Sequence, residues 1–165
     1  MLTKPNHWDI RFFELCDLVA SWSEDRGRKV GAVIVGQSNE IRSTGYNGFP
    51  RKVNPIPKER HNRANGEKYF WFEHAERNAI YNAARHGSII ENCRIYCSMF
   101  PCADCVRAII QSGIIELNTF SAPLDDDTFK RSFEVSRIML NEAGIKVRLF
   151  NQNNPHFNKL KLKSM

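Results

Sequence analysis

The sequence predicts an α/β protein, a three-layer α/β/α sandwich around a five-stranded mixed sheet. Short apolar or alternating segments of strand length recur along the 165 residues. Amphipathic segments of helical length separate the last three of these. Strands joined through a helix are parallel neighbours, whereas strands joined by a tight turn are antiparallel. We therefore expect strands three to five to be parallel and the first two to form an antiparallel pair.

Each element follows from the spacing of apolar residues and from helix-ending glycines. In chain order we expect a helix over 6–25, strands over 30–35 and 41–46, a helix over 74–87, a strand over 93–98, a helix over 102–113, a strand over 114–121, a helix over 129–143 and a strand over 145–149. The apolar face of the first helix comprises Trp8, Phe12, Leu15, Val19 and Trp22. The continuous apolar run over 30–35 is typical of a central strand, and the alternation over 145–149 indicates a half-exposed edge strand.

Length and composition fit a single domain, which we place at residues 1–150, followed by a basic C-terminal tail over 151–165. No segment has the pattern of a signal peptide, and no apolar run is long enough to cross a membrane. We therefore expect a cytoplasmic protein with reduced thiols and no membrane partner. Three of the five cysteines, Cys16, Cys93 and Cys97, fall on core-facing patterns and are expected to be buried apolar thiols.

Residues 47–70 contain three prolines, two glycines and little periodicity, which predicts a long functional loop. The stretch 51–70 carries six Lys or Arg against two Glu, and the tail carries three Lys and no acid, so the rest of the chain is close to neutral. A confined cluster of cations favours a local anionic partner such as a phosphate. We expect the loop over 51–68 to border the active site and help to capture an anionic substrate. The competing interpretation is that these cations face a partner subunit or water.

Two short motifs carry the chemistry: His-Ala-Glu at 74–76 and Pro-Cys-Ala-Asp-Cys at 101–105. They supply three ligands of the kind that zinc prefers, His74, Cys102 and Cys105. Catalytic zinc sites have three protein ligands and an open fourth position for water, whereas structural sites are closed by a fourth ligand. The pattern therefore predicts one catalytic Zn²⁺ as cofactor.

Both motifs must lie at helix starts for this prediction to hold. Cys102 and Cys105 are three residues apart and share a helix face, and the positive end of a helix dipole lowers thiol pKa values. His74 and Glu76 are two apart and would point to opposite sides within a helix. At the first turn, however, both can reach a metal just beyond the helix end.

Glu76 is the predicted catalytic residue. Zinc lowers the pKa of a bound water to about 7. Together, the His-x-Glu and Pro-Cys-x-x-Cys motifs resemble the signature of zinc nucleobase deaminases, which implies that Glu76, kept off the metal, takes the proton of that water and passes it to the ring nitrogen and then to the leaving amine. A Cys-x-x-Cys pair between a strand and a helix is also typical of thioredoxin-type redox sites. A non-enzymatic redox or zinc-binding module is therefore an alternative, but it would not need Glu76.

The chain resembles the cytidine and deoxycytidylate deaminase superfamily over about residues 8–150, and it is most similar to the deoxycytidylate (dCMP) deaminases. The resemblance is carried by residues 23–26 (Ser-Glu-Asp-Arg), 29–33 (Lys-Val-Gly-Ala-Val), 45–51 (Gly-Tyr-Asn-Gly-Phe-Pro-Arg), 73–80, 101–105 and 108–114. It implies zinc-dependent hydrolytic deamination of dCMP to dUMP and ammonia in pyrimidine nucleotide metabolism. The expected partners are a small nucleotide substrate and further copies of the chain in a homo-oligomer.

The resemblance also implies substrate contacts. Asn47 matches the asparagine that contacts the sugar or the base, and Ala75 matches the position whose backbone helps to hold the base. Arg26 and Lys29 lie where a 5′-phosphate could be met, although solvated charge at a turn would look the same. After Arg51 the sequence departs from the family pattern of a glycine followed by acidic residues, so regulation by nucleotides is not carried over.

Two other branches of the superfamily fit the sequence less well. Free-cytidine deaminases join their last two strands by a hairpin, whereas here a predicted helix separates residues 121 and 145, which disfavours that branch. A tRNA adenosine deaminase shares the parallel arrangement, and the basic loop and tail would suit RNA. The Tyr-Asn-Gly segment at 46–48 and the near-neutral remainder favour a mononucleotide, with the tRNA deaminase kept as the alternative.

Overall fold

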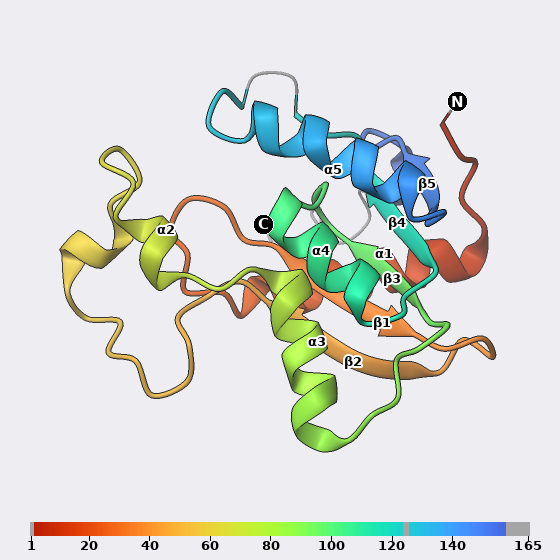
Figure 1. Cartoon of the computed structure of the whole chain (residues 1–165), viewed down its shortest axis with the longest axis horizontal. Helices are drawn as coiled ribbons and strands as arrows, with labels where there is room; N and C mark the ends of the chain where they lie inside the picture. The colour runs from red at the N-terminus through yellow and green to blue at the C-terminus, as the bar shows by residue number, and fades with distance from the viewer. Residues whose placement is uncertain (1, 124–125, 158–165) are drawn as a thin grey trace.

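A five-stranded mixed sheet in the order β2-β1-β3-β4-β5 forms the centre of the computed structural model, which describes residues 2–123 and 126–157 (Figure 1). The strands are β1 (Gly31–Val35), β2 (Ile41–Tyr46), β3 (Arg94–Cys97), β4 (Glu116–Phe120) and β5 (Lys146–Phe150). Strand β1 pairs antiparallel with β2 and β3, while β3, β4 and β5 run parallel. The predicted mixed sheet with strands three to five parallel is confirmed.

Helices cover both faces of the sheet (Figure 1). They are α1 (His7–Ser21), α2 (Lys68–Trp71), α3 (Ala75–His86), α4 (Ala103–Gln111) and α5 (Lys130–Glu142), with 3₁₀ turns η1 (Lys58–His61) and η2 (Pro155–Phe157). Side chains of β1 alternate between two core clusters. Ala32 and Ile34 pack with α3, α4 and α5, whereas Val33 and Val35 pack with α1 and η2. Five consecutive residues of β1 are buried, as expected of a central strand.

The first helix differs from its prediction at its end. Asn6 and Asp9 form a capping box at its start, but the helix ends at Ser21 rather than near residue 25. Trp22 consequently lies outside it and is 56% exposed, so its predicted place on the buried face is wrong. The cause is a polar turn that follows: the Ser23 hydroxyl donates to the Asn47 carbonyl and accepts from the Asp25 amide.

The third strand is covered on both faces, which the alternation over 93–98 did not indicate. Tyr96 is fully buried on the α1 side, where its hydroxyl donates a hydrogen bond of 2.8 Å to Asp9. The expected burial of Cys16, Cys93 and Cys97 is confirmed. Burial raises the pKa of the Cys16 and Cys97 thiols, so both are inert apolar side chains.

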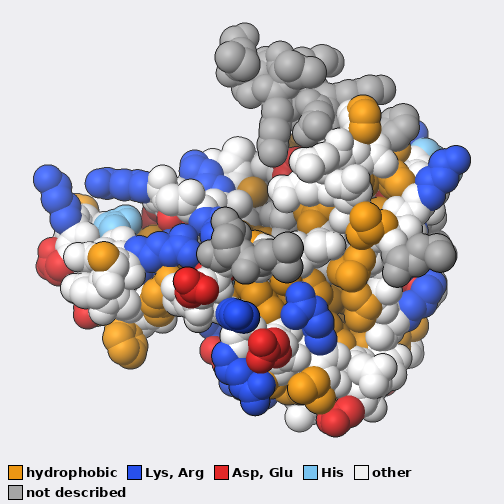
Figure 2. All heavy atoms as spheres, turned by 90° about the horizontal axis from the view of Figure 1, so that it is seen from above, with side chains coloured by type: hydrophobic (Ala, Val, Ile, Leu, Met, Phe, Trp, Pro, Cys, Tyr) orange, Lys and Arg blue, Asp and Glu red, His pale blue; other side chains and the backbone are white. Residues whose placement is uncertain are grey.

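The segment between β2 and α3 leaves the sheet and projects from one end of the molecule, where it carries η1 and α2 (Figure 1). Its two ends are held together by an antiparallel bridge in which Gly48 and Glu73 exchange backbone hydrogen bonds of 3.0 and 2.8 Å. In the view of Figure 2, Lys and Arg side chains gather at this same end. The loop is thus less irregular than its composition indicates, and it starts and ends beside α3, the helix that His74 precedes.

Residues 151–157, at the start of the expected tail, fold back over the sheet. Phe157 is buried and makes edge contacts with Phe13 and Phe120 at 5.1 and 5.4 Å. The lysines of the tail lie outside the described residues. Across the described ranges, 2–123 and 126–157, no helix is long and apolar enough to cross a membrane.

Candidate active site

Three sulfur and nitrogen ligands converge where α3 and α4 begin. His74 is the residue that precedes α3 and Cys102 the one that precedes α4, and both have extended backbone. The Nδ1 atom of His74 lies 3.4 Å from the Sγ atoms of both Cys102 and Cys105. Ligands of a tetrahedral zinc ion stand roughly 3.5 Å apart, given zinc–sulfur and zinc–nitrogen bonds of about 2.3 and 2.0 Å. The three side chains therefore fit zinc, and both motifs lie at helix starts as the spacing required.

The cysteine motif is held from the side by α5. The Ala103 amide donates to the Ser132 hydroxyl at 2.8 Å, and the Ser136 hydroxyl donates to the Pro101 carbonyl at 3.0 Å. Ser136 is fully buried. The helix that makes β4 and β5 parallel thus also orients the turn on which Cys102 stands.

The ligand group is electrostatically prepared for a cation. A hydrogen bond with Cys105, together with His74, lowers the pKa of Cys102 to about 4, so this sulfur is a thiolate at neutral pH. Burial raises the pKa of Cys105, whose proton must leave when a metal binds. Arg77, in the first turns of α3, adds positive charge nearby and forms an ion pair of 2.5 Å with Glu73.

Glu76 lies in the first turn of α3, 4% exposed, beside this group but not within it. Burial raises the pKa of its carboxyl above the ordinary value. A carboxyl that is off the metal and shifted toward neutrality is suited to both accept and donate a proton.

A pocket adjoins these residues. Aromatic side chains form much of its lining, which also includes His74, Ala75, Glu76 and Cys102. The aromatic members are Tyr69, Phe72, Phe100, Phe129 and Phe133. A concave site with apolar walls and a few converging polar groups is typical of small-molecule binding.

The comparisons with known proteins agree with this geometry. Residues 6–121 match the family model described as the cytidine and deoxycytidylate deaminase zinc-binding region. The chain belongs to the cytidine and deoxycytidylate deaminase family.

Relatives cover most of this deaminase. The "uncharacterized deaminase in luxG 3′ region" of Aliivibrio fischeri is 37% identical over 143 residues, which are 85% of this chain and 91% of the relative. The deoxycytidylate deaminase of Homo sapiens is 34% identical over 147 residues, 87% and 79% of the two chains. The structure of the dCMP deaminase of cyanophage S-TIM5 in complex with dCMP and dUMP shares the fold, with a TM-score of 0.70 at 21% identity over 90% of this chain and all of that one.

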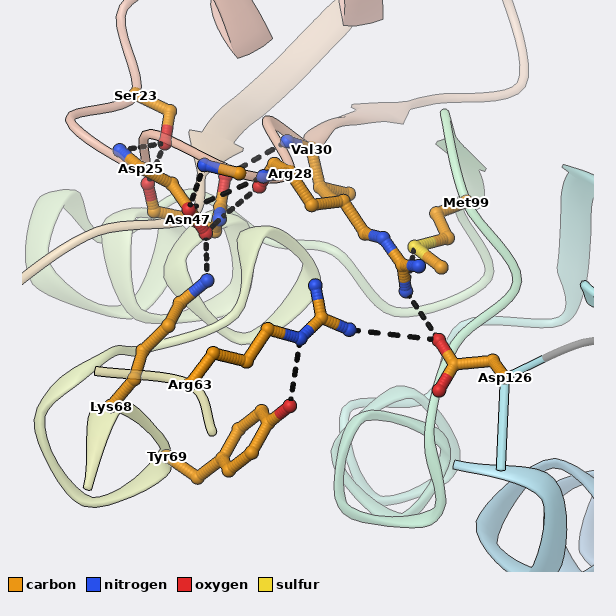
Figure 3. A network of polar contacts seen from close by, with 11 residues as sticks. Ser23, Asp25, Arg28, Val30, Asn47, Arg63, Lys68, Tyr69, Met99 and Asp126 are labelled. Carbon is orange, nitrogen blue, oxygen red and sulfur yellow. Dashed lines mark hydrogen bonds and ion pairs between the residues drawn. The ribbon is translucent and has the colours of Figure 1, made fainter. Parts of the chain in front are cut away.

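Asn47 lies in the wall of the pocket of this deaminase, and its side chain makes three hydrogen bonds to the turn before β1 (Figure 3). Its Oδ1 accepts from the Val30 amide at 2.8 Å, and its Nδ2 donates to Asp25 and to the Arg28 carbonyl, both at 2.9 Å. Both amide protons are thereby used, and one lone pair of Oδ1 is left for a ligand.

Asp25 and Lys68 both line the pocket. The sequence singles out neither of them, although Lys68 belongs to the loop over 51–68 that is expected to border the active site. Lys68, 8% exposed, donates from Nζ to the Asp25 carboxylate. The same carboxylate accepts from the amides of Gly27 and Arg28 through its other oxygen. Asp25 stands within the segment 23–26 that resembles the family, which is the one signal that the sequence offers for it.

The cations expected to meet a phosphate lie elsewhere. Arg26 and Lys29 are exposed and are not among the lining residues, and the Lys29 ammonium donates to the Ser21 carbonyl at 3.1 Å. Arg28, between them in the chain, lines the pocket. From the basic loop, Arg63 and Lys68 also line it, whereas Lys58 is exposed and Arg60 stacks on Trp71 at 3.9 Å.

Proposed function

We propose that this deaminase hydrolyses dCMP to dUMP and ammonia with zinc held by His74, Cys102 and Cys105. The observation that carries the proposal is one pocket lined by His74 and Cys102 of the His-Cys-Cys group, by the buried Glu76 and by three cationic side chains. The first two are the requirements of nucleobase deamination, and the cations suit a negatively charged nucleotide. Relatives named deoxycytidylate deaminase, at 33–35% identity in human, orang-utan, mouse and budding yeast, support the choice of substrate.

When bound, zinc would act as a Lewis acid that lowers the pKa of water, so that hydroxide is available as the nucleophile near neutral pH. Glu76 does the proton transfers: its carboxylate takes one proton of the attacking water and gives it to N3 of the cytosine, which keeps it, and then moves the second proton from the new C4 hydroxyl to the leaving amine. The C4–N bond breaks, and the water oxygen becomes the C4 carbonyl. The raised pKa of Glu76 suits a group that must hold the proton between these steps.

The remaining wall residues bind and orient the substrate. Phe72 and Phe129 present apolar surface to a planar base and exclude water. The Ala75 amide, at the first position of α3, has no partner within the helix and is available to the base carbonyl. The free lone pair of Asn47 Oδ1 is suited to accept from a sugar hydroxyl.

Ammonia release with the zinc-loaded chain tests the proposal. The substrates to compare are dCMP, deoxycytidine, CMP, dAMP and a tRNA anticodon stem-loop. We expect dCMP to be converted with the highest kcat/KM. Conversion of adenosine in the stem-loop without conversion of dCMP would instead establish the tRNA deaminase.

A further inference from the structure

Two arginines from separate segments converge at the pocket and share a single carboxylate (Figure 3). Arg28 comes from the turn before β1, and Arg63 from the basic loop. The NH1 atom of Arg28 lies 2.5 Å from Oδ2 of Asp126, and the NH2 atom of Arg63 lies 3.8 Å from the same oxygen. Asp126 is 8% exposed, and both arginine side chains are more than one third exposed.

The arginines face the pocket, and Asp126 does not. Arg28 and Arg63 are lining residues, whereas Asp126 is absent from the lining. Asp126 therefore holds both guanidinium groups from behind. Tyr69 adds a second restraint, since its hydroxyl accepts from Nε of Arg63 at 3.0 Å.

Much of the hydrogen-bonding capacity of the two guanidinium groups is unused. A guanidinium carries five N–H donors. Among the described residues, Arg28 finds partners through NH1 alone, the other being the Met99 sulfur at 3.9 Å. The NH1 atom of Arg63 finds none there. The remaining donors are free for an anion in the pocket.

The charge balance also leaves room for an anion. Lys68 is matched by Asp25, so this pair is neutral. Among the residues that the structure describes, the two arginines share Asp126 alone, which leaves one positive charge without an ion-pair partner at the wall of a partly apolar pocket. In such surroundings an uncompensated cation attracts an anion more strongly than it would in water.

We propose that Arg28 and Arg63 form the subsite for the phosphate monoester of the nucleotide, with Asp126 as the residue that positions them. This inference rests on the proposed function, because it assigns the same pocket a mononucleotide. Planar guanidinium groups recognise phosphate oxygens through paired, charge-assisted hydrogen bonds. The subsite replaces Arg26 and Lys29 as the place where the phosphate is met.

Equilibrium binding of product tests the subsite without relying on turnover. Calorimetry with the zinc-loaded chain would compare dUMP with deoxyuridine, which lacks the phosphate. We expect Arg28→Gln and Arg63→Gln each to raise the Kd for dUMP about 10- to 100-fold, because each variant loses charge-assisted hydrogen bonds to the phosphate. The Kd for deoxyuridine should stay within about twofold, which also reports that the variant is folded. Inorganic phosphate should compete with dUMP in the wild type and much less in either variant.

Two further variants separate this subsite from its rivals. Lys58→Gln removes an exposed cation of the same loop and should leave both Kd values unchanged. Arg26→Gln removes the same charge two residues from Arg28. If Arg26→Gln abolishes the preference for dUMP and Arg28→Gln does not, the proposed subsite is wrong. Equal affinity of the wild type for dUMP and deoxyuridine would also overturn it. Phosphate-dependent binding of dUMP without turnover of dCMP would leave the subsite intact and overturn the proposed reaction.

Discussion

Lys68 in α2 donates a hydrogen bond from Nζ to Oδ2 of Asp25, which lies just after α1. Both side chains are at most 10% exposed. Burial alone would raise the pKa of Asp25, but the hydrogen bond from Lys68 and those from the amides of Gly27 and Arg28 lower it below the usual value. Asp25 also accepts from Asn47. The basic loop is thus anchored to the wall of the pocket through a buried ion pair.

Removing Lys68 should therefore destabilise the protein strongly. Lys68→Met leaves the Asp25 carboxylate buried without its partner, which costs about 3–5 kcal/mol. Urea unfolding at pH 7 measures the change. Lys52→Met, at an exposed position of the same loop, is the matched control and should change stability by less than about 0.5 kcal/mol.

The double variant Asp25→Asn with Lys68→Met tests the coupling between the two residues. Because it leaves no buried unpaired charge, it should lose less stability than the two single variants added together. Strict additivity would show that the ion pair does not tie the loop to the pocket.

Substitution of a metal ligand and substitution of Glu76 should differ in their effects on zinc content. Cys102→Ala removes a zinc ligand, and we expect metal content and deaminase activity to be lost together. Glu76→Ala should keep about one zinc per chain and lower kcat by about 10³-fold, because general acid–base catalysis typically contributes a rate enhancement of that size. Elemental analysis and ammonia release on the same preparations give both readouts. Retained activity in the Glu76 variant would remove its role in proton transfer.

The ligand group was predictable because it depends on local geometry. A helix start and a spacing of three fix where Cys102 and Cys105 point, and His74 is separately placed at the start of α3. The parallel strands were equally predictable, since connection length sets strand direction. The burial of Tyr96 on the α1 side was not predictable, because it depends on which elements cover each face of the sheet.

Which cations line the pocket was the hardest feature to predict. The sequence does not distinguish Arg26, Arg28 and Lys29, because all three are cations within four consecutive residues. Their directions are set by the turn over 23–30, which is shaped by the side chains of Asp25 and Asn47. Asn47 in turn comes from a segment remote in the chain. No local sequence pattern indicates such a contact, so only the folded structure shows that Arg28, and neither Arg26 nor Lys29, lines the pocket.

Gly45 in β2 is required by the close approach of α3. A Cβ atom there would lie 2.3 Å from the Ala79 nitrogen and 2.4 Å from the Ala75 oxygen, both of which are backbone atoms. Gly45→Ala must push α3 away from the sheet, at a cost of about 1–3 kcal/mol. Because α3 starts at the metal-ligand group, we also expect zinc to dissociate more readily in competition with a chelator. Gly48→Ala is the control, since its Cβ would meet nothing closer than 4.0 Å. Equal stability of the two variants would contradict this account.

A second buried ion pair predicts how stability depends on pH. On the opposite face of the sheet, the Asp9 carboxylate accepts from Arg148 through two hydrogen bonds of 2.7 Å, and from the Tyr96 hydroxyl and the Asn6 amide. Burial alone would raise the pKa of Asp9, but Arg148 and the other donors outweigh it and hold the pKa below the usual value.

The sign of the effect follows from this lowered pKa. The unfolded chain binds a proton at Asp9 more readily than the folded chain does, so acid favours unfolding. The contribution of Asp9 is fully present above its unfolded pKa of about 3.9 and is lost as the pH falls through the lower, folded value. Asp9→Asn leaves Arg148 without its main partner and should cost about 3 kcal/mol at pH 7.

Urea unfolding of the wild type and Asp9→Asn at pH 7, 5, 4 and 3 checks this prediction. The gap in stability between the two proteins should be constant from pH 7 to 5 and should narrow below pH 4, because only the wild type then loses the charge on residue 9. Glu24→Gln, at an exposed position, should show little gap at any of these pH values. A gap between wild type and Asp9→Asn that stays constant down to pH 3 has two explanations. Either the folded pKa lies well below 3, or the stabilisation by Asp9 does not depend on its charge. Repeating the titration down to pH 2 separates them, and a gap that still does not narrow would refute the role of the ion pair.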